Sequence, residues 1–88
     1  MIRKVFVFFG IVQGVGFRWR AMKAAELCGC TGWVRNEWDG SVTMEIQGDE
    51  AQIDETVKAI ARSRYIRIDN MRSRLIPPVP EERGFHAR

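Results

Sequence analysis

Val12-Gln13-Gly14-Val15-Gly16-Phe17-Arg18 is the stretch where an apolar, strand-like run changes into a helical pattern. Its alternate glycines allow successive backbone N–H groups to turn toward one point. The start of the helix adds its own free N–H groups and the positive end of its dipole. Arg18 adds a planar guanidinium whose donors match the oxygens of a phosphate or a carboxylate. The stretch therefore predicts a site for a small oxyanion, with a phosphoryl group as the leading candidate.

A strand is predicted before this stretch and a helix after it. Val5-Phe6-Val7-Phe8-Phe9 is apolar at every position, which is typical of a central strand buried on both faces. From Phe17 to Cys28 the apolar residues fall at helical spacing, and Gly29 is a natural C-terminal stop. The first third of the chain therefore predicts one strand followed by one helix.

The middle of the chain predicts a hairpin. Residues 32–38 are rich in strand formers, and Asp39-Gly40 is a strong turn signal. The strand after the turn alternates regularly, which predicts one buried and one wet face. Its apolar positions are Val42, Met44 and Ile46, and its polar positions are Thr43, Glu45 and Gln47.

A second helix and a further strand are predicted in the last part of the chain. Asp49 with Gln52 three residues later is a capping-box pattern, and the helix that follows has an apolar stripe of Ile53, Val57, Ile60 and Ala61. The next strand runs from about Tyr65 to Ile76 and ends at prolines. Its apolar residues change phase, which predicts a bulge near Asp69-Asn70.

The element order is thus β-α-β-β-α-β, with Gly84-Phe85-His86-Ala87-Arg88 as a possible short fifth edge strand. This order predicts an α+β protein of the ferredoxin-like split βαβ type. Right-handed crossovers would place both helices on one face of an antiparallel sheet. No linker or repeat interrupts the pattern, so residues 1–88 are predicted to form a single domain.

Composition narrows the class of ligand and the cellular setting. The net charge of +3 suits an anionic ligand but is too small for a nucleic-acid tail. No apolar stretch approaches the roughly 20 residues of a membrane span, and the N-terminus lacks a signal cleavage site. Cys28 and Cys30 are too close in sequence for ordinary disulfide geometry, and His86 is the only histidine. We therefore expect a reduced, cytoplasmic protein without a metal ion or cofactor.

Several known phosphate motifs do not fit. The glycine spacing matches no P-loop, and Trp19 stands where a dinucleotide fingerprint has its third glycine. A cysteine-phosphatase loop, C-x5-R, also fails, because Val34 and Asn36 occupy the arginine positions that Cys28 and Cys30 would require. A plain strand-to-helix turn with a solvated Arg18 remains the alternative interpretation of the loop.

Asn36 is the second candidate site residue. A carboxamide holds a water through its carbonyl and its NH₂ group without the charge that would repel an anion. Asparagine before a hairpin is also a common turn residue, so both interpretations stay open.

Three segments together carry a family resemblance. Gly10-Ile11-Val12-Gln13-Gly14-Val15-Gly16-Phe17-Arg18, Gly32-Trp33-Val34-Arg35-Asn36 and Asp39-Gly40-Ser41-Val42 resemble the acylphosphatase family, and the similarity covers nearly the whole chain. The resemblance implies a ferredoxin-like sandwich that hydrolyses the carboxyl–phosphate bond of small acyl phosphates. It also implies that Arg18 binds the phosphate, that Asn36 orients the attacking water, and that the backbone from Gln13 to Arg18 cradles the phosphoryl oxygens.

The residues fit that chemistry. An acyl phosphate leaves as a carboxylate whose acid has a pKa of roughly 4, so no general acid is required. Phosphoryl transfer then depends on positioning and charge stabilisation, and no metal is demanded. We expect a monomer that acts on a small molecule and has no nucleic-acid or membrane partner.

Two other function classes remain as alternatives. Split βαβ domains also bind single-stranded RNA through aromatic side chains on the open sheet face. A non-catalytic accessory domain could bind acyl or carbamoyl phosphate for a larger enzyme. Trp19 and Trp38 could line a substrate mouth, but packing beside the helix start and the hairpin is the favoured interpretation, and Trp33 is predicted to pack in the sheet. The five arginines between 62 and 74 are predicted to form a solvated face.

Overall fold

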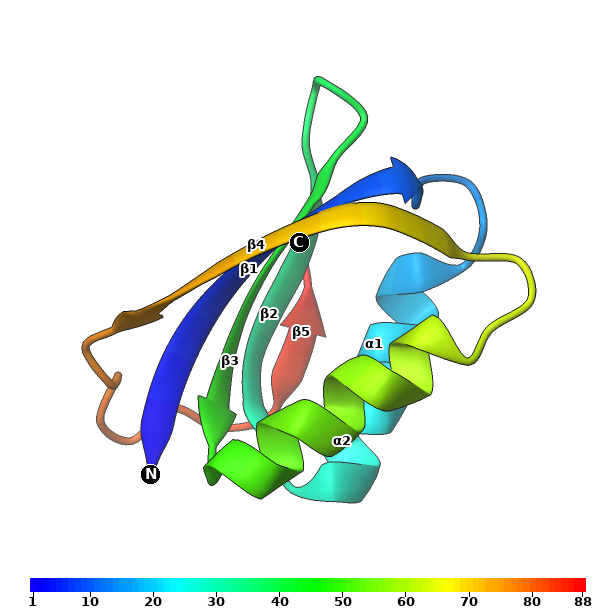
Figure 1. Ribbon diagram of the computed structural model, residues 1–88. Helices are drawn as coiled ribbons and strands as arrows, with labels where there is room; N and C mark the ends of the chain where they lie inside the picture. The colour runs from blue at the N-terminus through cyan, green and yellow to red at the C-terminus, as the bar shows by residue number, and fades with distance from the viewer.

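The computed structural model describes residues 1–88 as one sheet with two helices on the same face (Figure 1). The sheet order is β4-β1-β3-β2-β5. The predicted β-α-β-β-α-β order and the fifth strand are both confirmed. The elements are β1 (Ile2–Ile11), α1 (Phe17–Cys28), β2 (Thr31–Asn36), β3 (Val42–Gly48), α2 (Glu50–Ala61), β4 (Arg67–Ile76) and β5 (Phe85–Ala87).

The sheet is mixed rather than antiparallel throughout. β1 and β2 both pair antiparallel with β3, and β4 pairs antiparallel with β1. β5 instead pairs parallel with β2, through Gly32 and Phe85, Trp33 and His86, and Val34 and Ala87. The chain leaves β4 at one edge of the sheet and enters β5 at the other, and β5 then runs in the same direction as β2. The predicted antiparallel pairing is confirmed for β1 to β4, and the fifth edge strand, whose direction was not predicted, adds one parallel pairing.

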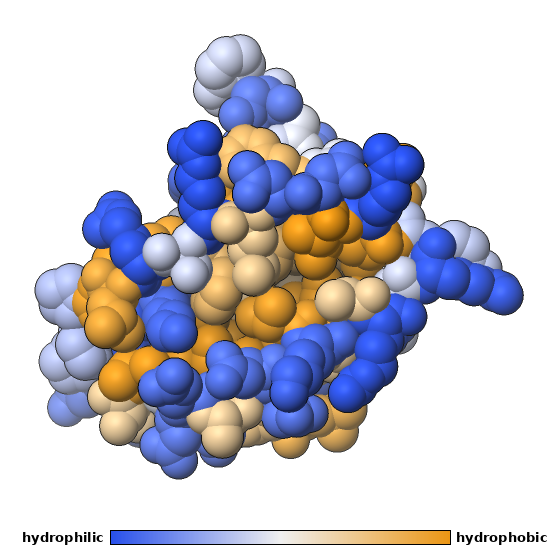
Figure 2. All heavy atoms as spheres, viewed as in Figure 1, coloured by the Kyte–Doolittle hydropathy of each residue, from blue (hydrophilic) through white to orange (hydrophobic).

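The core lies between the sheet and the helices. Phe6 and Phe8 of β1 are 4% and 0% exposed, and their rings stack at 5.7 Å. The fully buried Val42, Met44 and Ile46 of β3 confirm the apolar face predicted from alternation. Figure 2 shows that apolar residues stay visible between β4 and α2, bordered by charged ones, so the helices do not cover this edge completely.

The predicted end of α1 and the predicted start of α2 are both confirmed. Gly29 has a φ of 78°, and the N–H of Cys30 bonds the carbonyl oxygen of Ala25 at 2.9 Å. At the start of α2, the N–H of Asp49 donates to the side-chain oxygen of Gln52 at 2.8 Å. The predicted apolar stripe of α2 is wrong at its end, because Ala61 is exposed.

Thr56 is part of the core, although the predicted apolar stripe of α2 did not include it. It is fully buried between Ile53 and Ile60. Its hydroxyl donates to the carbonyl oxygen of Gln52 at 2.9 Å, so the buried polar atom is satisfied and costs little.

The predicted bulge in β4 is present. Phe9 pairs with Asn70 while Gly10 pairs with Ile68, so Asp69 is the extra residue. Gly10 has a φ of 134°, and a Cβ there would collide with the carbonyl oxygen of Arg67. The bulge therefore requires glycine on the neighbouring strand.

The wet face predicted for β3 is covered at one end. Gln47 is only 5% exposed, because the connection between β4 and β5 folds over it. Its side chain exchanges two hydrogen bonds with the backbone of Val79, at 3.0 and 2.7 Å. Arg3, which is 2% exposed, bonds the carboxylates of Glu82 and Glu45 at the same end. This polar cluster closes the end of the sheet where β1 begins.

Candidate active site

The loop predicted to bind an oxyanion connects the end of β1 to the start of α1. Gly14 and Gly16 have φ values of 72° and 78°, in the left-handed region that favours glycine. A Cβ at either position would meet no atom within 4 Å. The conformation of the backbone, rather than a lack of space, therefore requires glycine here.

The N-terminus of α1 is open to an anion. Its first bond of the helical type runs from the N–H of Arg20 to the carbonyl oxygen of Gly16, at 3.0 Å. No side chain caps the helix, and its first turn has no acidic residue. The N–H groups of the first turn, including those of Phe17 and Arg18, lack partners within the helix. Their partial positive charge attracts a negative group.

Arg18 and Asn36 line one hollow of about 200 Å³ at this helix start. Arg18 is exposed, and its Nη1 makes a long hydrogen bond of 3.5 Å to the carbonyl oxygen of Arg88. Arg18 is the one charged residue that lines the hollow. The two predicted site residues therefore come together, with a net positive charge beside a carboxamide.

The sheet fixes the position of Asn36. It is the last residue of β2 and pairs with Val42 of β3, next to the β1 residue Phe8. Because side chains alternate along a strand, Asn36 lies on the same face as the buried Val34 two residues earlier. Its half-buried side chain thus ends the row of core residues and borders the hollow.

Gln13 has a role that the sequence analysis missed. It was predicted to contribute its backbone to the cradle, but its side chain also spans to the β2–β3 hairpin. Its Nε2 donates to the carbonyl oxygens of Glu37 and Ser41 at 2.7 and 2.9 Å. Gln13 therefore ties the loop that precedes Arg18 to the segment that follows Asn36. No local pattern signals this contact, because the partners are far apart in sequence.

The acidic residues of the hairpin are engaged away from the hollow. The hydroxyl of Thr43 and the guanidinium of Arg35 bond Glu37 and lower its pKa. The hydroxyl and N–H of Ser41 similarly lower the pKa of Asp39. Neither carboxylate lines the hollow, so its potential stays favourable for an anion.

Two tryptophans do not pack as predicted. Trp38 is 97% exposed at the hairpin, and Trp19 is 64% exposed. Trp19 instead lines the hollow beside Arg18 and Asn36. Trp33, by contrast, is buried in the sheet as predicted, with an exposure of 8%.

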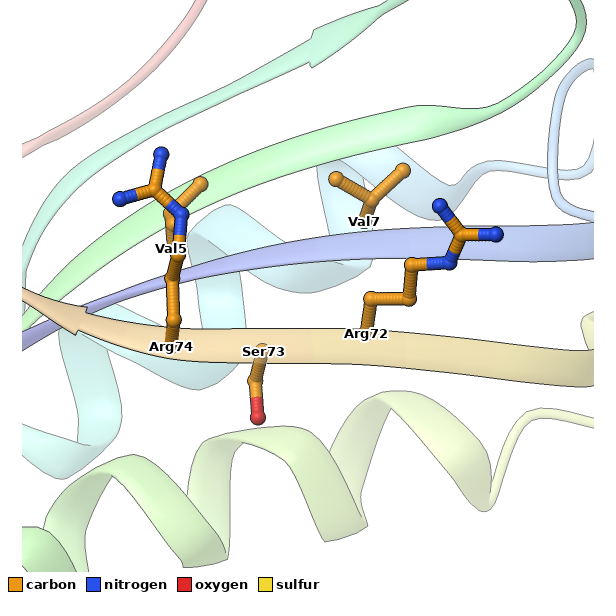
Figure 3. Close-up of a pocket in the computed structure, with 5 residues that line it drawn as sticks. All are labelled: Val5, Val7, Arg72, Ser73 and Arg74. Atoms are coloured by element: carbon orange, nitrogen blue, oxygen red, sulfur yellow. The ribbon is translucent and has the colours of Figure 1, made fainter.

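A second hollow, of about 210 Å³, lies on the face of the sheet away from the helices. Figure 3 shows that Arg72 and Arg74 of β4 point the same way as Val5 and Val7, whereas Ser73 points toward α2. This hollow has guanidinium groups but no helix N-terminus and no carboxamide. It lacks the combination that the first hollow provides.

The open sheet face also lacks the exposed aromatic pair that RNA-binding domains of this fold use. The ring of Trp33 lies under the guanidinium groups of Arg35 and Arg88, at 5.0 and 4.7 Å. Arg72 lies over Phe9 at 5.4 Å. These guanidinium groups occupy the ring faces on which bases would stack.

The cysteines offer no obvious nucleophile. Burial raises the pKa of the Cys30 thiol, which lies 3.8 Å from the hydroxyl of Thr56.

No three histidine, cysteine, aspartate or glutamate residues gather into a metal-binding group. Neither helix has the length and apolar character that a membrane span needs.

Comparison with known proteins agrees with these features. The acylphosphatase family model matches residues 4–87. An acylphosphatase of Bifidobacterium longum is 37% identical over 90 aligned residues, which cover 100% of this chain and 93% of the relative. The acylphosphatase structure from Bacillus subtilis superposes with a TM-score of 0.91 at 26% identity, covering 100% and 99% of the two chains.

A larger protein contains a similar unit. HypF from T. kodakarensis matches with a TM-score of 0.84 at 28% identity, covering 99% of this chain but only 12% of HypF. The family match extends over almost all of this chain and includes both segments that meet at the hollow. The protein is therefore a member of the acylphosphatase family, whose enzymes hydrolyse acyl phosphates.

Proposed function

We propose that the hollow between the loop and Asn36 is the active site, and that the protein hydrolyses acyl phosphates there by direct attack of water. The observation that carries this proposal is the meeting of Arg18 from α1 and Asn36 from β2 at one uncapped helix start. The oxyanion cradle would bind the phosphoryl group, and the neutral carboxamide beside it would hold the attacking water.

The phosphoryl group binds at the loop. Backbone N–H groups between Gln13 and Arg18 face its oxygens, and the helix dipole adds a favourable field. Arg18 forms paired hydrogen bonds with two of the oxygens. Charge that develops on these oxygens during the reaction meets fixed donors, which lowers the barrier without any rearrangement.

Asn36 holds the nucleophile. Its side-chain oxygen accepts a hydrogen bond from a water, whose oxygen is aimed at phosphorus. The water oxygen forms a bond to phosphorus as the bond from phosphorus to the acyl oxygen breaks, and the electron pair leaves with the carboxylate. A proton of the water passes to a phosphoryl oxygen of the substrate. Because the leaving carboxylate is a weak base, it needs no protonation.

Phosphate release from benzoyl phosphate, without added metal, tests the proposal. Wild type is compared with Arg18→Ala and Asn36→Ala after circular dichroism shows that all three are folded. We expect both variants to lose at least about a hundredfold in kcat. Turnover of folded wild type no faster than spontaneous hydrolysis would contradict the proposal, and full activity of Asn36→Ala would remove Asn36 from it.

An accessory binding domain is the second candidate. It draws support from HypF, in which a similar unit makes up a small share of a larger protein. A folded wild type that binds phosphate but does not hydrolyse benzoyl phosphate would favour this alternative. The cytoplasmic location, the monomeric state and the independence of metals and cofactors stay predictions from the sequence.

A further inference from the structure

The hollow has a single apolar side chain that a bound molecule could reach. Val12 and Phe17 also line it, but they are 1% and 2% exposed and belong to the core. Gly14 and Gly16 have no side chain. Trp19 is 64% exposed, so its indole is the accessible apolar surface beside the polar groups.

The phase of α1 explains the exposure of Trp19. Phe17 points into the core, where its ring lies 4.9 Å from that of Phe8. Two residues later the helix has turned by about 200°, so Trp19 points away from the core. One further turn along, the Nζ of Lys23 lies 5.9 Å from the centre of the indole. This weak cation–π contact leaves most of the ring free.

The acyl group of a bound substrate must lie at the rim of the hollow. The phosphoryl end of the substrate is held by the loop, so its acyl group must extend outward. In an in-line displacement the acyl oxygen departs on the side of phosphorus away from the attacking water. Asn36 on β2 holds that water, and Trp19 stands on a different element, α1. Trp19 is therefore the exposed apolar side chain of the hollow that takes no part in holding the water, so it is free to contact the acyl group.

We infer that Trp19 determines substrate specificity by contacting the acyl group, and that it favours flat, apolar acyl groups over the acetyl group. This inference rests on the proposed hydrolysis of acyl phosphates. An aromatic acyl group stacks against the indole in an offset arrangement, whereas an acetyl group is too small to cover it. Because the contact lies at an exposed rim, we expect a preference of about fivefold from it.

The test compares kcat/KM for benzoyl phosphate and acetyl phosphate in four proteins. These are wild type, Trp19→Ala, Trp19→Phe and Trp38→Ala. Trp38 is the matched control, because it is 97% exposed and does not line the hollow. We expect the benzoyl-to-acetyl ratio to fall about fivefold in Trp19→Ala. The ratio should stay near the wild-type value in Trp19→Phe and Trp38→Ala, and inhibition by inorganic phosphate should not change in any of them.

The outcomes separate this inference from the proposed function. If wild type hydrolyses both substrates and Trp19→Ala keeps the wild-type ratio, the inference is wrong and the proposed function stands. Equal losses with both substrates, or weaker inhibition by phosphate, would place Trp19 in general support of the site and also overturn the inference. If wild type hydrolyses neither substrate, both fail together. Trp19→Gln, whose side chain suits a helix, serves in place of Trp19→Ala if circular dichroism finds that variant unfolded.

Discussion

The side-chain nitrogen of Gln13 lies 2.7 Å from the carbonyl oxygen of Glu37 and donates a hydrogen bond to it. This bond connects the loop before α1 to the hairpin after β2. Arg18 follows the loop, in the first turn of α1, and Asn36 precedes the hairpin as the last residue of β2. The same nitrogen of Gln13 also donates to the carbonyl oxygen of Ser41 at 2.9 Å. Gln13 therefore adds a side-chain restraint, beyond the pairing of the sheet, on the distance between the loop and Asn36.

Replacing Gln13 should affect catalysis more than substrate binding. In Gln13→Ala the carbonyl oxygens of Glu37 and Ser41 lose a donor, and we expect a loss of about 1–2 kcal/mol in the free energy of unfolding. The loop then loses a restraint on its distance from Asn36, which the sheet still holds, so kcat should fall about tenfold. Urea unfolding and steady-state kinetics with benzoyl phosphate measure the two effects.

Gln52→Ala is the matched control for that experiment. Gln52 also uses its side-chain amide to bond backbone, at the start of α2, but it does not line the hollow. The Gln52→Ala variant should lose a similar amount in the free energy of unfolding, while its kcat stays at the wild-type value. If both variants lose kcat equally, the loss reflects stability and Gln13 has no positioning role.

Two glycines should respond differently to alanine. Gly16 has a φ of 78° and free space around a Cβ, so Gly16→Ala costs roughly 1 kcal/mol of backbone strain and the protein folds. The strained turn shifts the N–H groups at the start of α1, and kcat/KM should fall at least about tenfold. Benzoyl phosphate hydrolysis and circular dichroism measure both expectations.

Gly32→Ala provides the contrast. Gly32 has a φ of 143°, and its Cβ would collide with the carbonyl oxygen of Glu45 in β3. Since backbone atoms on the neighbouring strand cannot move aside, we expect this variant to fail to fold. A folded Gly32→Ala, or a Gly16→Ala with wild-type activity, would contradict the respective argument.

The sequence predicted those features that depend on local pattern. The turn at Asp39-Gly40, the helix stop at Gly29 and the bulge at Asp69 each follow from residues within a few positions. The direction of β5 does not, because it depends on where the connection after β4 crosses the sheet. The burial of Gln47 has the same cause, since Val79 of that connection covers it.

In the candidate site, too, some features follow from local sequence and others from contacts between distant segments. The resemblance of their two motifs to the acylphosphatase family implied that Arg18 and Asn36 share a site, and the structure places both at one hollow. Gln13 was assigned only a backbone role, because its hydrogen bonds reach a distant segment. Large aromatic residues usually lose most of their exposure on folding, which is why Trp19 was expected to pack. The helix phase set by Phe17 overrides that tendency.

Asn36→Asp tests the importance of a neutral side chain at this position. The substitution keeps the shape but places a carboxylate in a hollow that holds a phosphoryl group. We expect kcat/KM to fall at least about a hundredfold at pH 7, because the carboxylate repels the phosphoryl oxygens and lacks the NH₂ donor of asparagine. Inhibition by inorganic phosphate should weaken in Asn36→Asp but stay near the wild-type value in Asn36→Ala. Equal phosphate inhibition in the two variants would contradict the charge argument.

The pairing of Arg3 with Glu82 predicts that the protein loses stability in acid. Burial raises the pKa of Glu82, but the hydrogen bonds from Arg3 and Thr31 and the positive charges of Arg3 and Arg88 outweigh it and lower the pKa overall. A carboxyl whose pKa is lowered by folding stabilises the protein above its ordinary pKa, and this stabilisation is lost as the pH falls through the folded-state pKa. The free energy of unfolding should therefore decrease between about pH 5 and pH 3.

Glu82→Gln should remove part of that dependence. At pH 7 the substitution weakens the hydrogen bonds between Arg3, which is 2% exposed, and residue 82, which is 14% exposed. The free energy of unfolding should therefore fall by about 2 kcal/mol. As the pH falls, Glu82 in wild type becomes protonated, so the difference between wild type and variant should shrink. Urea unfolding at several pH values measures this, with Glu55→Gln as the control because that carboxylate is 56% exposed. A difference between wild type and Glu82→Gln that stays constant from pH 7 to about pH 3 would show that Glu82 keeps its proton affinity on folding.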